Sequence, residues 1–234
     1  MQTFIGTAGW SIPAAHAHAF VTEGAHLARY AAVMNAVEIN SSFHRPHRPK
    51  TYERWRATVG AGFCFSVKLP KTITHELRLK GCKDLIAQFF DESAGLGNGL
   101  KVVLVQLPPS LAYDARAADS FFGVLRRSTE ATIVCEPRHA SWFTSQADVA
   151  LADLKVSRVA ADPIRAPGAS LPGGWKGLRY WRLHGSPKLY YSSYSLEYLQ
   201  SLASAMRDGD WCIFDNTMSG AALGNALELR ALTS

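Results

Sequence analysis

The 234-residue sequence has no run of about 18 apolar residues, the length that a helix needs to cross a bilayer. Its first residues also lack the basic segment followed by an apolar segment that marks a secretory signal. We therefore expect a cytoplasmic protein without a membrane partner. Charged residues make up only 19% of the chain and hydrophobic residues 47%, which excludes disorder and predicts a single domain over residues 1–234.

Motifs for metal, redox and nucleotide chemistry are missing as well. The four cysteines lie far apart at Cys64, Cys82, Cys135 and Cys212 and form no C-x-x-C pair, which argues against a zinc site or a redox motif. No G-x-G-x-x-G follows the first apolar run, and there is no phosphate-binding loop. The net charge of +6 permits anionic partners but is too small to require nucleic acid.

What the sequence does contain is an alternation of short apolar runs and helical patterns. The apolar runs predict parallel strands at 4–8, 36–40, 63–69, 101–107, 132–136, 156–161, 178–184 and 211–215. Helical patterns occupy 24–34, 50–59, 83–94, 117–127, 145–154, 196–206 and 220–232. The segment 163–174 is too rich in Pro and Gly for a helix. We therefore predict an α/β fold, a (β/α)₈ TIM-type barrel in which a loop replaces the helix between the sixth and seventh strands.

Polar side chains collect where the predicted strands end, which is where barrels carry their functional groups. We predict four catalytic residues, Glu38, Lys68, Glu136 and His184. We predict substrate contacts from Trp10, Asn40, Gln106, Arg138, Asp162, Arg182 and Asn216. The alternative is an interior network of ion pairs that only supports the fold, because buried charges need partners.

These residue types favour an enzyme that acts on a phosphorylated or other small anionic substrate at the carboxyl ends of the strands. In this hypothesis Glu38 or Glu136 is a general base, Lys68 with Arg138 or Arg182 holds negative charge, and His184 carries a proton. No cofactor is expected. Lys68 as an amine that forms a Schiff base is a covalent variant of the same hypothesis.

Two other functions are kept as alternatives. A divalent metal bound by Glu38, Glu136, Asp162, Asp215 and His184 would give a phosphodiesterase or an endonuclease-like hydrolase, although one histidine among nearby cations is a poor ligand set. Basic loops such as 44–50 (HRPHRPK) would suit a non-catalytic module that binds nucleic acid.

Seven motifs in chain order resemble the YecE-like family, a domain of unknown function. They are 5–11 (IGTAGWS), 37–43 (VEINSSF), 65–68 (FSVK) with 73–75 (ITH), 106–109 (QLPP), 136–142 (EPRHASW), 182–185 (RLHG) and 214–217 (FDNT). The sequence departs from the usual family pattern at His44, Pro137 and Asp215. The resemblance implies a TIM-type barrel and supplies no reaction.

Overall fold

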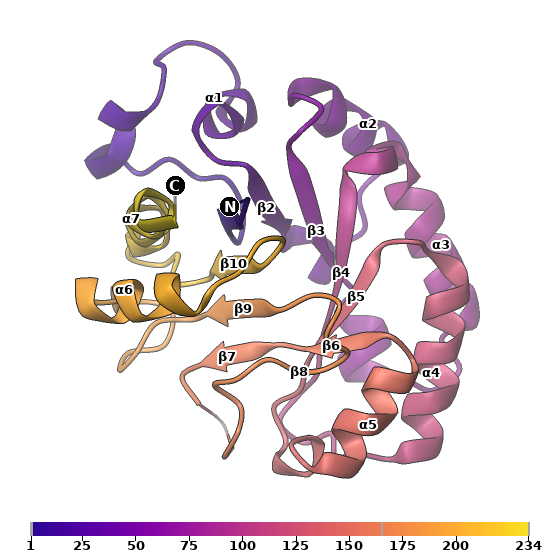
Figure 1. The fold of residues 1–234 in the computed structure, drawn as a ribbon. Helices are drawn as coiled ribbons and strands as arrows, with labels where there is room; N and C mark the ends of the chain where they lie inside the picture. The colour runs from indigo at the N-terminus through magenta and orange to yellow at the C-terminus, as the bar shows by residue number, and fades with distance from the viewer. Residues whose placement is uncertain (1, 165, 234) are drawn as a thin grey trace.

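The computed structural model describes residues 2–164 and 166–233, and strands alternate with helices along the chain (Figure 1). The strands are β1 (Phe4–Thr7), β2 (Ala36–Ile39), β3 (Cys64–Lys68), β4 (Leu100–Gln106), β5 (Thr132–Glu136), β6 (Val156–Arg158), β7 (Ala160–Asp162), β8 (Gly173–Gly174), β9 (Tyr180–Leu183) and β10 (Trp211–Phe214). The α-helices are α1 (His26–Val33), α2 (Pro49–Thr58), α3 (Lys83–Ser93), α4 (Ala115–Ser128), α5 (Ser145–Asp153), α6 (Leu196–Ala205) and α7 (Ala221–Thr233). Short 3-10 or π turns are η1 (Ala14–Ala19), η2 (Ser41–Phe43), η3 (Thr72–Glu76), η4 (Ala94–Gly99) and η5 (Ala140–Trp142).

The strands form two sheets. One contains the parallel strands β1, β10, β9 and β7 in that order. The other has the order β2, β3, β4, β5, β6, β8 and is parallel except for β8, which runs antiparallel to β6. Within residues 2–164 and 166–233 no closed sheet is found, so the observed fold is mixed α/β with parallel sheets.

The predicted sixth strand, 156–161, is divided between the two sheets. Val159 separates β6 from β7, and its N–H donates to the Cys135 carbonyl at 2.8 Å. Before Val159, β6 pairs with β5, and after it, β7 pairs with β9. The expected loop follows β7, since the described part of 163–174 contains no helix; Arg165 lies outside the described residues. The two-residue strand β8 was not predicted, because two glycines carry no strand signal.

The β1 and β2 strands belong to different sheets but approach closely. Ala8 and Glu38 form an isolated parallel bridge, and the Gly9 N–H donates to the Glu38 carbonyl at 2.8 Å. A Cβ on Gly6 would lie 2.1 Å from the Ala36 carbonyl oxygen. Only glycine therefore permits this contact between the two backbones.

All seven predicted helices are present, with shifts of a few residues at their ends. Pro49 starts α2 with a fixed φ, and the Asp114 carboxylate caps α4 by accepting from the N–H groups of Arg116 and Ala117. Figure 1 shows α2 to α5 along the outer side of the six-stranded sheet and α6 and α7 beside the other sheet. No helix in the described ranges is long and apolar enough to span a bilayer.

The alternation of strand residues creates two apolar clusters. The larger lies between the strands and the helices and includes Val103, Val105 and Leu125. The smaller contains Ala36, Cys64, Val102, Leu104, Val134, Val159, Tyr180, Trp211 and Ile213. Because side chains two apart share a face, this inner cluster lies on the strand face that also carries Glu38, Lys68 and Glu136. This cluster therefore packs beside the polar groups, on the side toward the amino ends of the strands.

Candidate functional site

A polar cluster lies at the carboxyl ends of the strands and contains Glu38, Lys68, Gln106, Glu136, Arg138, Arg182, His184 and Asp215. Arg182 on β9 lies at its centre and is fully buried. Its guanidinium donates from Nε and Nη2 to the Glu38 carboxylate, with a shortest distance of 2.7 Å. Nη1 donates to Glu136 Oε2 at 3.2 Å, and Nη2 lies 3.0 Å from Asp215 Oδ2. One arginine thus joins carboxylates from β2, β5 and the end of β10, which a lysine could not do because it lacks the planar fork.

His184 lies between two carboxylates just above Arg182. Its Nε2 is 2.9 Å from Glu136 Oε1, and its Nδ1 is 3.0 Å from Asp215 Oδ2. A carboxylate accepts hydrogen bonds but does not donate them. Each contact is therefore a hydrogen bond when the ring nitrogen that faces the carboxylate carries a proton. Glu136, His184 and Asp215 form a continuous line along which a proton can move.

Glu136 contacts four side chains of the cluster, among them Arg182 and His184. Its Oε1 also accepts from Gln106 Nε2 at 3.1 Å and from Arg138 Nε and Nη2 at 3.2 and 3.1 Å. Burial alone raises the pKa of Glu136, but the charges of His184, Arg182 and Arg138 together outweigh burial and hold that pKa well below its usual value. Burial likewise opposes ionisation of Asp215, and the charges of Arg182, His184 and Lys68 still lower its pKa. Both carboxyl groups are therefore ionised near neutral pH.

Lys68 differs from the other cations of the cluster because it has no acidic partner among the described residues. It is 5% exposed at the end of β3, and no carboxylate oxygen of the described residues lies within 4.0 Å of its Nζ. Nζ lies 4.0 Å from the centre of the Phe43 ring. Burial, followed by the charge of Arg182, lowers the pKa of Lys68 to about 8 against the opposing effect of Glu38, Glu136 and Asp215. A substantial fraction of this amine is neutral in mildly alkaline solution.

Two further side chains contribute to the site although they were not predicted as site residues. The Tyr180 hydroxyl lies 3.2 Å from both Glu38 Oε2 and Ser66 Oγ and supports the cluster from beneath. The His75 ring packs edge-on against Phe43 at 5.0 Å, and burial, then the charges of Lys68 and Arg138, lowers the pKa of His75. Alternation along β9 could have revealed Tyr180, since it shares a face with Arg182 and His184. His75 lies in η3, where no strand alternation applies, and the sequence pointed to it through the motif 73–75 (ITH).

Four predicted substrate contacts lie outside the cluster, and two of them, Asp162 and Asn216, contact other elements of the fold. Asp162 pairs with Leu183, whose side chain faces the helices, and the Asp162 carboxylate accepts from the Tyr194 hydroxyl at 2.8 Å. The Asn216 side-chain nitrogen donates to the Ser192 carbonyl at 2.9 Å and to Asn225 Oδ1 at 3.0 Å, so this side chain contacts α7 instead.

Trp10 and Asn40 line a separate cavity of about 410 Å³ at the ends of β1 and β2. The Trp10 ring packs edge-on against Trp55 at 5.1 Å. Asn40 Oδ1 is buried and has no hydrogen-bond partner among the described residues. The remaining predicted residues, Glu38, Lys68, Gln106, Glu136, Arg138, Arg182 and His184, come together in the cluster.

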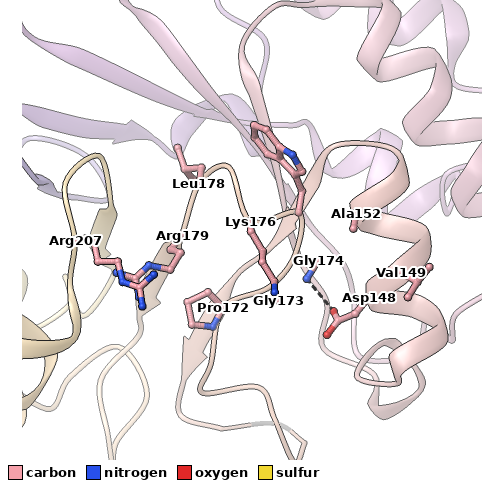
Figure 2. Close-up of a pocket in the computed structure, with 11 residues that line it drawn as sticks. Asp148, Val149, Ala152, Pro172, Gly173, Gly174, Lys176, Leu178, Arg179 and Arg207 are labelled. Atoms are coloured by element: carbon pink, nitrogen blue, oxygen red, sulfur yellow. Dashed lines mark hydrogen bonds between the residues drawn. The ribbon is translucent and has the colours of Figure 1, made fainter.

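A larger cavity, of about 610 Å³, lies away from these residues (Figure 2). It is lined by Gly173 and Gly174 of β8 and by residues that precede β9 and β10, including Arg179 and Arg207, and so lies near the amino ends of those strands. None of the predicted site residues lines it. Among residues 2–164 and 166–233, no group of three or more His, Cys, Asp or Glu side chains is arranged to hold a metal ion.

Solved structures with the same fold include two DUF72 family proteins. The Enterococcus faecalis protein has a TM-score of 0.83 and 18% identity, over 99% of this chain and 95% of that one. The Thermotoga maritima protein has a TM-score of 0.79 and 22% identity, over 99% of each chain. A xylose isomerase-like TIM barrel/4-hydroxyphenylpyruvate dioxygenase fusion protein matches with a TM-score of 0.54 and 16% identity, over 99% of this chain and 42% of the fusion protein. These identities show similarity of fold alone.

Sequence comparison gives a closer relationship. The UPF0759 protein YecE of Escherichia coli K12 is 32% identical over 106 residues, which cover 45% of this chain and only 37% of YecE. The family profile described as protein of unknown function DUF72 matches residues 4–234. This match extends over nearly the whole sequence, and the chain therefore belongs to the DUF72 family.

Proposed function

We propose that this protein is an enzyme that binds a small anionic substrate at the carboxyl ends of its strands. Lys68 and Arg138 hold the negative charge of the substrate, and the line of Glu136, His184 and Asp215 moves a proton. The observation that carries the proposal is the Lys68 side chain, which is 5% exposed and lies beside ion-paired arginines but has no carboxylate partner of its own among the described residues. A buried cation without a counterion is costly unless a ligand supplies the missing charge.

The charges of the cluster support the same proposal. Glu38, Glu136 and Asp215 already contact Arg182, Arg138 or His184, so none of these carboxylates contacts Lys68 directly. Two events remove the charge of Lys68, the binding of an anion or the loss of the Lys68 proton. An anion such as a phosphate or carboxylate also matches the donors of Arg138, which keeps partial contact with solvent.

Both carboxylates of the proton line also contact Arg182, which fixes their positions. When substrate takes a proton from His184, the imidazole left behind keeps one N–H and one acceptor nitrogen. The ring can then regain a proton from a group on the substrate, which is general acid and base catalysis by one residue.

We propose in addition that the two sheets close into a single (β/α)₈ barrel domain. The Ala8–Glu38 bridge and the Gly9 N–H bond join β1 to β2, and the chain passes without a break from β6 through Val159 to β7. Closure would bring all strand ends to one mouth. Slow hydrogen exchange of the Gly9 amide would support closure, and exchange at the rate of an exposed loop amide would contradict it.

Anion binding is tested by thermal unfolding with inorganic phosphate, sulfate, citrate, sugar phosphates and neutral sugars. A ligand at 100 times its Kd stabilises by about 2.7 kcal/mol, which raises Tm by about 5–10 °C for a chain of this size. Lys68→Met should abolish this shift, whereas Lys101→Met, at an exposed position on β4, should keep it. The absence of a shift with every anion would refute the proposal. A shift only with oligonucleotides that disappears at high salt would favour a nucleic-acid-binding module instead.

Catalysis is tested with the anion that binds. Glu136→Gln should retain binding and lose turnover of that ligand, because the amide cannot accept the His184 proton. Unchanged turnover in this variant would remove Glu136 from the mechanism.

A further inference from the structure

The amine of Lys68 contacts no carboxylate among the described residues, which leaves it able to react with another group. Nζ of Lys68 contacts no oxygen acceptor within the described residues, and its neighbour is the Phe43 ring. A lysine that served only to neutralise buried carboxylates would be expected to contact one of them. Glu38, Glu136 and Asp215 are instead paired with Arg182, Arg138 and His184.

The groups around Lys68 also disfavour its ammonium form. Burial and the charge of Arg182 act against a second positive charge at this place, and His75 responds to the charges of both Lys68 and Arg138. These effects hold the pKa of Lys68 at about 8. An ordinary exposed lysine with a pKa of about 10.4 has a neutral fraction at pH 8 that is about a hundredfold smaller. A neutral amine is the nucleophile that adds to a carbonyl group.

We propose that Lys68 forms an imine with an aldehyde or ketone group of the anionic substrate. This inference rests on the proposed function and narrows the substrate to an anion that carries a carbonyl group. The Nζ lone pair of the neutral amine forms a bond to the carbonyl carbon while the C=O π electrons move to oxygen, which takes a proton, and the nitrogen then gives up one of its two protons. The resulting hydroxyl accepts a second proton and leaves as water, and the carbon–nitrogen double bond remains as a protonated imine. Overall, a carbonyl compound and the ammonium form of Lys68 give an iminium and water.

The remaining members of the cluster suit this step. Arg138 lies at the end of β5 and holds the anionic group, while the line of Glu136, His184 and Asp215 supplies and recovers the protons of the carbinolamine. An iminium keeps the single positive charge of Lys68, so the balance with the substrate anion is unchanged after the bond forms. In this step Nζ of Lys68 forms a covalent bond with the substrate itself.

Reductive trapping tests the proposal directly. Pyridoxal 5′-phosphate, an aldehyde that carries a phosphate group, is incubated with the whole protein at pH 8 and then reduced with borohydride, and the modified lysines are quantified by peptide mass spectrometry. We expect Lys68 to be modified about tenfold or more faster than the exposed Lys71 and Lys101, because its neutral fraction is larger. Inorganic phosphate should slow the modification of Lys68 and leave the other two lysines unaffected. Lys68→Arg should lose the fast modification.

The outcomes separate the two proposals. Modification of Lys68 no faster than of Lys71 and Lys101 would overturn the imine, and anion binding would still stand if phosphate raises Tm. Fast modification of Lys68 that phosphate does not slow would support the amine and refute the anion site. The decisive labelling is done on the unaltered protein, so it does not depend on whether a variant folds.

Discussion

Replacing Lys68 by methionine should stabilise the protein at neutral pH, although it removes a predicted site residue. Methionine matches lysine in length and keeps the contact with the Phe43 ring, but it carries no charge to bury. A pKa of about 8 in place of 10.5 means that folding disfavours the ammonium form. At about 1.36 kcal/mol for each pKa unit, the buried charge costs about 3 kcal/mol at pH 7.

The dependence on pH gives the sharper test. Between pH 8 and 10.5 the unfolded chain binds a proton at Lys68 that the folded protein has released, so the stability of the unaltered protein rises with pH across this window. The free-energy cost of burying the Lys68 charge falls to about 1 kcal/mol at pH 10. The stabilising effect of Lys68→Met should therefore shrink by about 2 kcal/mol between pH 7 and pH 10.

The measurement is urea unfolding of the unaltered protein, Lys68→Met and Lys101→Met at pH 7, 8, 9 and 10. Lys101→Met controls for the loss of an exposed lysine and should differ from the unaltered protein by less than about 0.5 kcal/mol at each pH. If Lys68→Met is instead less stable at pH 7, or if its effect does not change with pH, Lys68 serves the fold as an ion-pair partner. That result would remove the observation on which the proposed function depends.

Three further predictions concern the cluster and the strands that carry it. Arg182→Met should cost about 3–5 kcal/mol in urea unfolding because it leaves three carboxylates without their shared partner, whereas Glu76→Gln, in the exposed pair with Lys71, should change stability by less than about 0.5 kcal/mol; equal effects would contradict the buried network. The pKa of Glu136 is lowered by folding, so the stability that it contributes is complete above its unfolded pKa of about 4.3 and is lost as the pH falls toward the folded value. The free energy of unfolding should consequently decrease more between pH 6 and pH 3 for the unaltered protein than for Glu136→Gln. Equal decreases in the two proteins would disprove the assignment. Gly6→Ala should destabilise by about 2 kcal/mol or more because its Cβ would meet the Ala36 carbonyl, while Gly60→Ala, where a Cβ meets nothing within 4 Å, should lie within about 1 kcal/mol of the unaltered protein.

The succession of strands and helices followed from the sequence because it depends on local patterns. Short β-branched runs such as that of β4 cannot form an amphipathic helix, and the Pro and Gly residues of 163–174 exclude one in the described part of the segment after β7. Alternation along each strand is also a local property, and it is enough to place Arg182 and His184 on one face of β9 and Glu38 on the matching face of β2. The same rule, counted through Val159 to residue 162, would have turned Asp162 toward the helices.

Only the tertiary structure decided which charges are paired. A count along strands tells which face a side chain shares, but the distances between ends of strands far apart in the chain depend on register, twist and side-chain rotamers. These placed Arg182 against three carboxylates and His184 between two of them, and they left Lys68 against an aromatic ring. They also moved Trp10 and Asn40 to a separate cavity. The sequence thus determined which residue types meet at the strand ends, whereas packing across the sheets determined that one amine has no carboxylate partner among the described residues.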